Sequence, residues 1–231
     1  MRKKKTSWPI IIIFLILLAA YALSVGFQRN ARYAKVFHQF GKDCSEQHCS
    51  LDERMALAEK AVFHNPEFSD GYTVLGELHR EKGEVPAALE LHKKALGLDL
   101  KNERSLLALG VHYFNENDLA QSLRYLNHFD SFYNRNYGLN YYLGRVHERL
   151  GNPILAVNYY KKAHSLDTGN DLRAYARLGA LEAQRGDVKE AFKYIQEIRG
   201  KGEEDLARAL EAFVRSPIHK EGMPIEEQIR R

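Results

Sequence analysis

The 231-residue chain lacks the short motifs that mark common catalytic sites. It has no G-x-S-x-G nucleophile elbow, no H-E-x-x-H zinc motif, no Walker phosphate loop and no G-x-G-x-x-G dinucleotide loop. It has ten histidines, but His79, His92 and His147 fall at helix positions where packing accounts for them. We therefore predict no catalytic residue, no cofactor and no metal ion. An envelope enzyme would need a site that these residues do not provide.

Cysteine is scarce, since Cys44 and Cys49 are the only two in the chain. They bracket the sequence Ser-Glu-Gln-His, and we predict that they form a small disulfide loop in an oxidising compartment. Two free thiols are one alternative. Another is a metal site that adds His48 and His38, although this spacing is not a recognised zinc pattern. The C-x-x-C-H motif for haem attachment is absent.

Acidic residues are missing from the N-terminal part of the chain. Residues 1–35 hold seven basic residues and no acidic one, which leaves 27 basic and 30 acidic residues in the remainder. The sequence pI of about 8.9 is therefore a property of the N-terminal segment. The rest of the chain has a slightly negative net charge and gives no support to nucleic-acid binding.

An uncharged run covers residues 6–28 and has an 18-residue apolar core from Ile10 to Phe27. As a helix this core rises about 27 Å, close to the thickness of the bilayer hydrocarbon. We predict a membrane anchor over 8–27, with residues 1–7 cytoplasmic because Lys and Arg are more numerous before the span than after it. The rival is a signal peptide cleaved after Ala20-Tyr21-Ala22, but apolar residues continue beyond that site.

Leucine-glycine pairs recur with a period of 34 or 35 residues along the rest of the chain. The pairs are Leu75-Gly76, Leu109-Gly110, Leu143-Gly144 and Leu178-Gly179. Twelve residues after each glycine stands a small residue, and a large one follows four residues later: Ala88/His92, Ser122/Leu126, Ala156/Tyr160 and Ala191/Ile195. Glycine on one helix and the small residue on the next are expected to let two antiparallel backbones approach closely.

This pattern resembles the tetratricopeptide (TPR) repeat. The resemblance implies an all-α solenoid of helix-turn-helix repeats over 51–199, with repeats at 69–102, 103–136, 137–170 and 172–199 and a degenerate unit before 69. Residues 28–50 then form a juxtamembrane segment. We expect an amphipathic helix over 203–216 to cap the last repeat, since Leu206, Leu210, Phe213 and Val214 form one stripe. Residues 217–231 are expected to be a mobile tail.

In TPR proteins the first helix of each repeat lines a concave, partner-binding face. In that family, certain positions of the first helix point toward this concave face. The residues at those positions here form a predicted partner-binding groove: Leu107, Val111, Phe114, Tyr141, Arg145, Arg149, Arg173 and Arg177. A peptide with apolar anchors and acidic residues would suit such a surface, and we expect its arginines to be exposed. The alternative is that Tyr141 and Tyr142 pack internally against Phe132 and Tyr133.

One TPR subclass grips a terminal carboxylate with lysine and asparagine at set inward positions. This chain departs from that subclass, since in the frame that starts at Ser69 those positions hold Thr73, Glu77, Ala108, Gly138 and Tyr142. In the frame one repeat earlier they hold Gln39, Asp43, Val74, Arg104 and Ala108. Neither set supplies the donors that a carboxylate needs, so we reject that role.

The resemblance and the N-terminal run together favour a membrane-anchored TPR scaffold or adaptor. Its repeats are expected to face the periplasm or another extracytoplasmic space and to bind protein or peptide partners in bacterial envelope assembly or protein maturation. The alternative is a cytosol-facing membrane receptor for protein targeting. Reduced cysteines would favour that alternative.

The cysteine prediction can be tested by thiol labelling. We expect the denatured, unreduced protein to show no reactive thiol at Cys44 or Cys49. Because the closed loop is short, its removal should cost on the order of 2 kcal/mol at most. Two labelled thiols in protein isolated under non-reducing conditions would contradict the disulfide.

Overall fold

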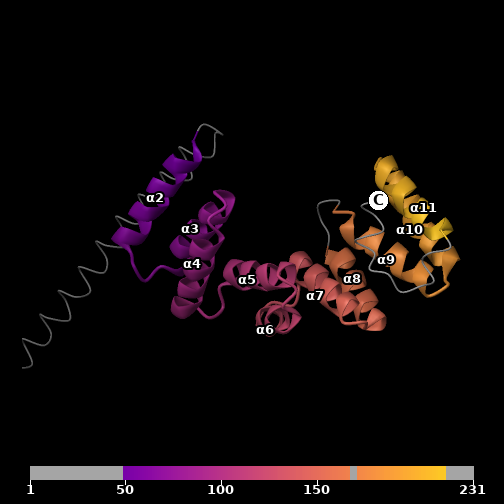
Figure 1. Ribbon diagram of the computed structural model, residues 1–231, viewed down its shortest axis with the longest axis horizontal. Helices are drawn as coiled ribbons and strands as arrows, with labels where there is room; N and C mark the ends of the chain where they lie inside the picture. The colour runs from indigo at the N-terminus through magenta and orange to yellow at the C-terminus, as the bar shows by residue number, and fades with distance from the viewer. Residues whose placement is uncertain (1–48, 167–170, 217–231) are drawn as a thin grey trace, which may run out of the picture. The chain divides into compact units, whose positions relative to one another are not determined.

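The computed structural model describes residues 49–166 and 171–216, and within these ranges the chain forms helices and no strand (Figure 1). The predicted all-α helical-repeat fold is confirmed for this part of the chain. The helices are α2 (Leu51–His64), α3 (Ser69–Glu81), α4 (Val85–Leu98), α5 (Glu103–Asn115), α6 (Leu119–Asp130), α7 (Tyr137–Arg149), α8 (Pro153–Leu166), α9 (Arg173–Gln184), α10 (Val188–Gly200) and α11 (Glu204–Arg215).

The predicted anchor over 8–27 lies outside the described residues, as do Cys44 and the tail over 217–231. Among the described helices, none combines the length and apolar character needed to cross a bilayer. The anchor, the disulfide and the tail therefore stay predictions.

The chain divides into two compact units, with residues up to Ser105 in unit 1 and residues from Leu106 onward in unit 2. In unit 1, α2 begins with a capping box at Ser50. The Ser50 Oγ accepts a hydrogen bond from the backbone N of Glu53 at 3.3 Å, and the Glu53 carboxylate accepts one from the Ser50 backbone N at 2.8 Å. Both donors would otherwise lack a partner at the helix start. Helix α3 packs against α2 and α4.

A buried polar side chain lies between α3 and α4 of unit 1. The His92 ring is 2% exposed and lies against Gly76, where an added Cβ would meet the ring Nε2 at 2.9 Å. The His92 Nδ1 lies 3.1 Å from the Ser105 Oγ, which is 2.9 Å from the Thr73 Oγ1. The opposite ring nitrogen, Nε2, has no hydrogen-bond partner. This site accepts a neutral imidazole and penalises a charged one.

The periodic glycines of unit 2 also lie against large side chains. A Cβ added at Gly110 would come within 2.6 Å of Leu126 Cδ2, and one at Gly144 within 2.7 Å of Tyr160 Cε1. The Tyr160 ring takes the space next to Gly144. The small residues lie close by as well, since the Ser122 hydroxyl donates to the carbonyl oxygen of Gly110 at 2.8 Å. The missing Cβ thus admits a large side chain next to the glycine.

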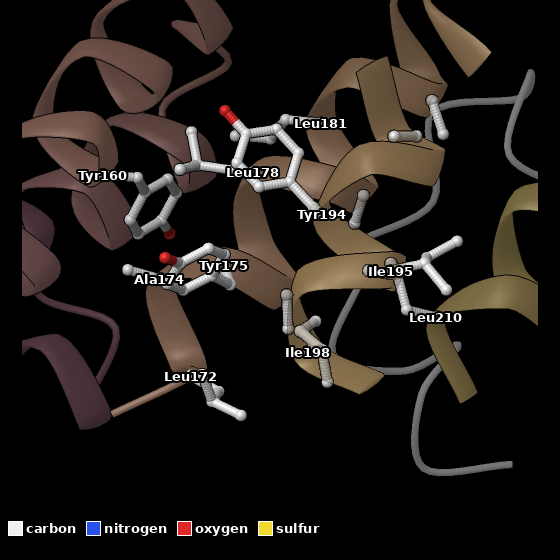
Figure 2. Packing of buried hydrophobic residues seen from close by; sticks show 14 of the residues in the cluster. Tyr160, Leu172, Ala174, Tyr175, Leu178, Leu181, Tyr194, Ile195, Ile198 and Leu210 are labelled. Atoms are coloured by element: carbon white, nitrogen blue, oxygen red, sulfur yellow. The ribbon is translucent and has the colours of Figure 1, made fainter. Parts of the chain in front are cut away.

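Helix α11 contributes to the core at the C-terminal end of unit 2. It packs against α9 and α10, and Ala207, Leu210, Phe213 and Val214 are buried. A Cβ added at Gly179 would meet Leu210 Cδ2 at 2.7 Å, so α11 covers the third periodic glycine of this unit. Figure 2 shows the cluster in which these side chains meet, with Tyr160, Tyr175, Leu178, Leu181, Tyr194, Ile195, Ile198 and Leu210 among its members.

The turns within the helix pairs share one backbone conformation. Gly83, Gly151 and Gly186 have φ values of 86°, 72° and 87°, and Asn117 has a φ of 60° at the corresponding place between α5 and α6. This left-handed region suits glycine, and asparagine tolerates it better than most residues. The α5–α6 turn therefore keeps the same geometry without a glycine.

Burial makes His92 a source of acid sensitivity in unit 1. Desolvation, with the nearby charges of Arg80 and Arg104, lowers the pKa of His92 from 6.5 to about 4. The folded state then binds this proton less readily than the unfolded state, so stability falls as pH drops below 6.5 and levels off below about 4. Between about pH 7.5 and pH 5 the loss from this group should be about 2 kcal/mol.

His92→Leu should remove that part of the pH dependence. Urea unfolding followed by circular dichroism at both pH values measures it. If the wild type and His92→Leu lose equal stability between the two pH values, protonation of His92 is not the cause of the acid sensitivity.

Candidate functional site

The residues predicted for the binding face come from three helices of unit 2. Tyr141, Arg145 and Arg149 follow one another at four-residue spacing on α7, which places them on one side of the helix. Arg173 and Arg177 have the same spacing on α9. The remaining three, on α5, are Leu107, Val111 and Phe114.

Two of the predicted contact residues are not open to a partner. Phe114 is 1% exposed and Tyr141 is 4% exposed, whereas Leu107 and Val111 are half-buried. Burial of Tyr141 agrees with the internal-packing alternative, but its neighbours differ from those expected. Its ring stacks on Tyr137 with 6.0 Å between ring centroids and 7° between ring planes.

Phe132 and Tyr133 are exposed by 42% and 38%, and Tyr133 makes an edge contact with Phe129. The Tyr141 ring also contacts Tyr142 and Tyr160, at 5.4 and 5.8 Å between centroids. The internal packing of Tyr141 is therefore with its own helix and with α8.

Arginine side chains lie over these buried rings. The Cζ atoms of Arg149 and Arg145 are 3.9 and 4.7 Å from the centre of the Phe114 ring. Arg145 Cζ is also 5.8 Å from the centre of the Tyr141 ring, and Arg173 Cζ is 4.8 Å from the same centre. Each is within the range of a cation–π contact. We call these five residues the arginine–aromatic ladder.

Arg149 is held at one end of the ladder by the backbone of α5. Its Nη1 donates a hydrogen bond of 2.8 Å to the carbonyl oxygen of Phe114, in the last turn of that helix. A cation suits this position because the C-terminal carbonyls carry partial negative charge. Burial, with the charges of Arg145 and Arg177, lowers the pKa of Arg149. A guanidinium nonetheless stays charged at neutral pH.

Arg177 belongs to a largely buried ion pair, so the expectation that it is exposed is wrong. Its Nη1 lies 3.2 Å from the Glu148 Oε1, and the two side chains are only 12% and 15% exposed. The Tyr160 hydroxyl donates to the Glu148 Oε2 at 2.6 Å. Burial opposes the charge of Arg177, but the Glu148 carboxylate outweighs it and the pKa is raised. Burial raises the pKa of the Tyr160 hydroxyl well above its ordinary value, and the negative charge of Glu148 raises it further.

Arg173 is oriented by Asp171, two residues before it. The Asp171 Oδ1 accepts from the backbone N of Arg173 at 3.0 Å and from its Nε at 2.9 Å. These hydrogen bonds hold the pKa of Asp171 below its ordinary value. The Tyr137 hydroxyl donates to the Asp171 carbonyl oxygen at 3.5 Å, and burial raises the pKa of Tyr137. Arg173 is thus fixed while part of its side chain stays exposed.

The face as a whole is rich in arginine. Its four arginines are Arg145, Arg149, Arg173 and Arg177, and Glu148 and Asp171 form ion pairs with Arg177 and Arg173. Guanidinium groups attract anionic ligands. Inward positions alone identified the arginines. They missed Asp171, Tyr137 and Tyr160, although the Asp-x-Arg spacing before α9 was a visible signal for the first of these.

The described residues hold no group of three or more His, Cys, Asp or Glu side chains that could bind a metal ion. The guanidinium groups of this face can form ion pairs and hydrogen bonds.

A family model for the tetratricopeptide repeat matches residues 137–170, which comprise α7 and α8. This segment of the chain is similar to the tetratricopeptide repeat. Helix pairs of the same kind occur in both units, although the family model matches one of them. The tetratricopeptide repeat is a protein-interaction fold, and its helices supply surfaces for peptides or proteins.

Known proteins share parts of this chain or its fold. Peroxisome biogenesis protein 5 of Arabidopsis thaliana is 37% identical over 76 residues, which are 33% of this chain and 10% of that protein. Among solved structures, YrrB, described as a TPR protein with an unusual peptide-binding site, has a TM-score of 0.58 at 18% identity, covering 76% of this chain and 89% of its own. PilF of Pseudomonas aeruginosa has a TM-score of 0.59 at 17% identity, covering 89% and 97%. The two structures show likeness of fold.

The buried ion pair predicts that Arg177 supports the fold. Arg177→Glu would place a second carboxylate beside Glu148 in a poorly solvated position, and we expect it to lower the free energy of unfolding by about 3 kcal/mol or more. Arg124→Glu, on the exposed side of α6, makes the same charge change and should cost less than about 0.5 kcal/mol. Chemical denaturation measures both. Equal stability of the two variants would contradict a structural role for Arg177.

Proposed function

We propose that this chain is a scaffold that binds an acidic segment of a partner protein on the arginine–aromatic ladder of unit 2. The observation that carries this proposal is the gathering of arginines on one face, where each is held in place by a ring, a carboxylate or a backbone carbonyl. Fixed charges lose little conformational entropy when a ligand binds. Carboxylates are the complementary groups that a protein segment can offer.

Covered rings favour a protein ligand over single-stranded nucleic acid. Proteins that bind single strands without sequence preference stack bases on open aromatic faces. Here Phe114 and Tyr141 are buried beneath arginines, so they offer no such platform. The likeness of fold to a protein described as having a peptide-binding site supports the same choice.

For its place in the cell, we propose a membrane anchor over 8–27 and repeats on the extracytoplasmic side, with a role in bacterial envelope assembly or protein maturation. The basic residues before the apolar run support this orientation. The two cysteines beyond the run suit an oxidising compartment.

A cytosol-facing membrane receptor for protein targeting is the second candidate. The observation in its favour is the 37% identity to Peroxisome biogenesis protein 5 over a third of this chain. The matched region is a tenth of that protein, so the likeness extends to the repeats and to little else of it. The thiol state of Cys44 and Cys49 separates the two candidates.

The proposed function predicts that Arg145→Glu weakens partner binding without unfolding the chain. Photocrosslinking from Leu107 in intact cells should recover a partner with the wild type. Recovery should fall about tenfold with Arg145→Glu, since the new charge repels an acidic segment. Arg124→Glu is the matched control and should recover the partner as the wild type does. Unchanged recovery by a folded Arg145→Glu variant would remove the ladder from the binding surface.

A further inference from the structure

Three large apolar side chains are exposed at one end of unit 1. Phe63 is 79% exposed in the last turn of α2, and Leu98 and Leu100 are 41% and 65% exposed where α4 ends and the loop to α5 begins. In the described part of unit 1 the other exposed large apolar residue is Val85, at the start of α4. We call Phe63, Leu98 and Leu100 the apolar end of unit 1.

The start of α3 shows that the two helix ends lie at the same end of the unit. A Cβ added at Gly71 would meet Val62 Cγ1 at 2.7 Å, and the Ser69 Oγ donates a hydrogen bond of 3.0 Å to the carbonyl oxygen of Ala95. Val62 belongs to the last turn of α2 and Ala95 to the last turn of α4. Both last turns therefore contact the first turn of α3.

Leu100 lies on an ordered loop. The Asp99 carboxylate accepts a hydrogen bond of 2.9 Å from the backbone N of Lys101, and the Asp99 carbonyl oxygen accepts one of 3.1 Å from the backbone N of Asn102. The Asn102 Nδ2 donates to the Ser69 Oγ at 2.8 Å, and Asn102 is buried. The fold thus holds the Leu100 side chain in contact with solvent, where its apolar surface is unfavourable.

Resting on the proposed membrane anchor, we propose that the apolar end of unit 1 lies on the bilayer surface and places its three side chains in the interfacial region of the phospholipid. Apolar side chains exposed together on a folded surface mark contact sites, and burial at the boundary of headgroups and acyl chains stabilises them. Unit 1 is the unit nearer to the proposed anchor in the sequence. The tether raises the effective concentration of lipid at this unit, so a small patch suffices.

The chain between the anchor and α2 is long enough for this arrangement. The apolar end is the far end of α2 from the anchor, and α2 has 14 residues, which as a helix rise about 21 Å. Residues 28–48 separate the proposed anchor from the described part of the chain, and a stretch of that length spans at most about 70 Å. The far end of unit 1 can therefore reach the membrane.

The opposite end of unit 1 is less suited to a bilayer. Asp52 and Glu53 are exposed in the first turn of α2, and Arg54 pairs with the exposed Glu81 at the end of α3. Anionic headgroups repel carboxylates, and removing such charges from water costs free energy. Of the two ends, the apolar end is the better one for lipid.

Brominated lipid tests this inference on the 231-residue chain in membranes. Trp8 is the only tryptophan, so Leu100→Trp in a Trp8→Phe background reports on the apolar end alone. The protein is reconstituted into phosphatidylcholine vesicles with or without bromine on the acyl chains. We expect brominated lipid to reduce the Leu100→Trp emission by about half or more, because an interfacial side chain lies against the acyl chains.

Val85→Trp in the same background is the matched control, since Val85 is also exposed but lies at the other end of unit 1. Its emission should fall by less than about a tenth, because it stays in water. Phe63→Glu, added to Leu100→Trp, should restore most of the emission, since a carboxylate is costly to remove from water. Val85→Glu makes a similar change at the opposite end and should leave the quenching as it was.

Weak quenching of Leu100→Trp, or equal quenching of Leu100→Trp and Val85→Trp, overturns the inference when the protein floats with the vesicles, and it leaves the anchor standing. Blue-shifted Leu100→Trp emission that brominated lipid does not quench would assign the apolar end to a protein surface and would also overturn the lipid contact. Protein that does not float with the vesicles refutes the anchor, and the inference falls with it. Partner recovery with Arg145→Glu is a separate measurement and depends on neither result.

Discussion

The contact between Gly144 and Tyr160 is the constraint on which the candidate site depends. A glycine on the first helix leaves room for a tyrosine ring from the second, at a distance that no Cβ would permit. The ring then lies so that its hydroxyl reaches Glu148, one turn further along α7. Glu148 in turn holds Arg177 of α9. One missing methyl group thereby connects helix packing to the charge pattern of the binding face.

In unit 1 a different side chain packs against the periodic glycine. His92 takes the place opposite Gly76 and brings a ring nitrogen without a partner into the interior. Its other nitrogen joins Ser105 and Thr73, so the polar groups are only partly satisfied. A buried polar group that lacks a partner costs free energy, and a buried charge costs more. A neutral histidine is tolerated at this position, whereas protonation of His92 at low pH destabilises the fold.

The binding face combines buried rings with partly exposed cations. Aromatic residues at a predicted interface suggest hot spots that a partner touches directly. Here Phe114 and Tyr141 support arginines, so in the proposed binding they act through the orientation of Arg145, Arg149 and Arg173. Preorganised charge gives fast association and selectivity for charge pattern, and the resulting affinity is sensitive to salt.

The amino-acid sequence by itself determined the helical repeat and the residues of the face. A period of 34 residues and small side chains at set intervals predict paired helices, and inward positions identify Arg145 and Arg173, because periodicity specifies which side of a helix a residue occupies. Periodicity does not specify which side chain of the neighbouring helix lies opposite that residue. The contact of the Tyr160 ring with Gly144 and the burial of Arg177 against Glu148 were decided by the packing of one helix on another. These contacts join residues 12 to 29 positions apart, and their partners are set by side-chain volume and desolvation in three dimensions.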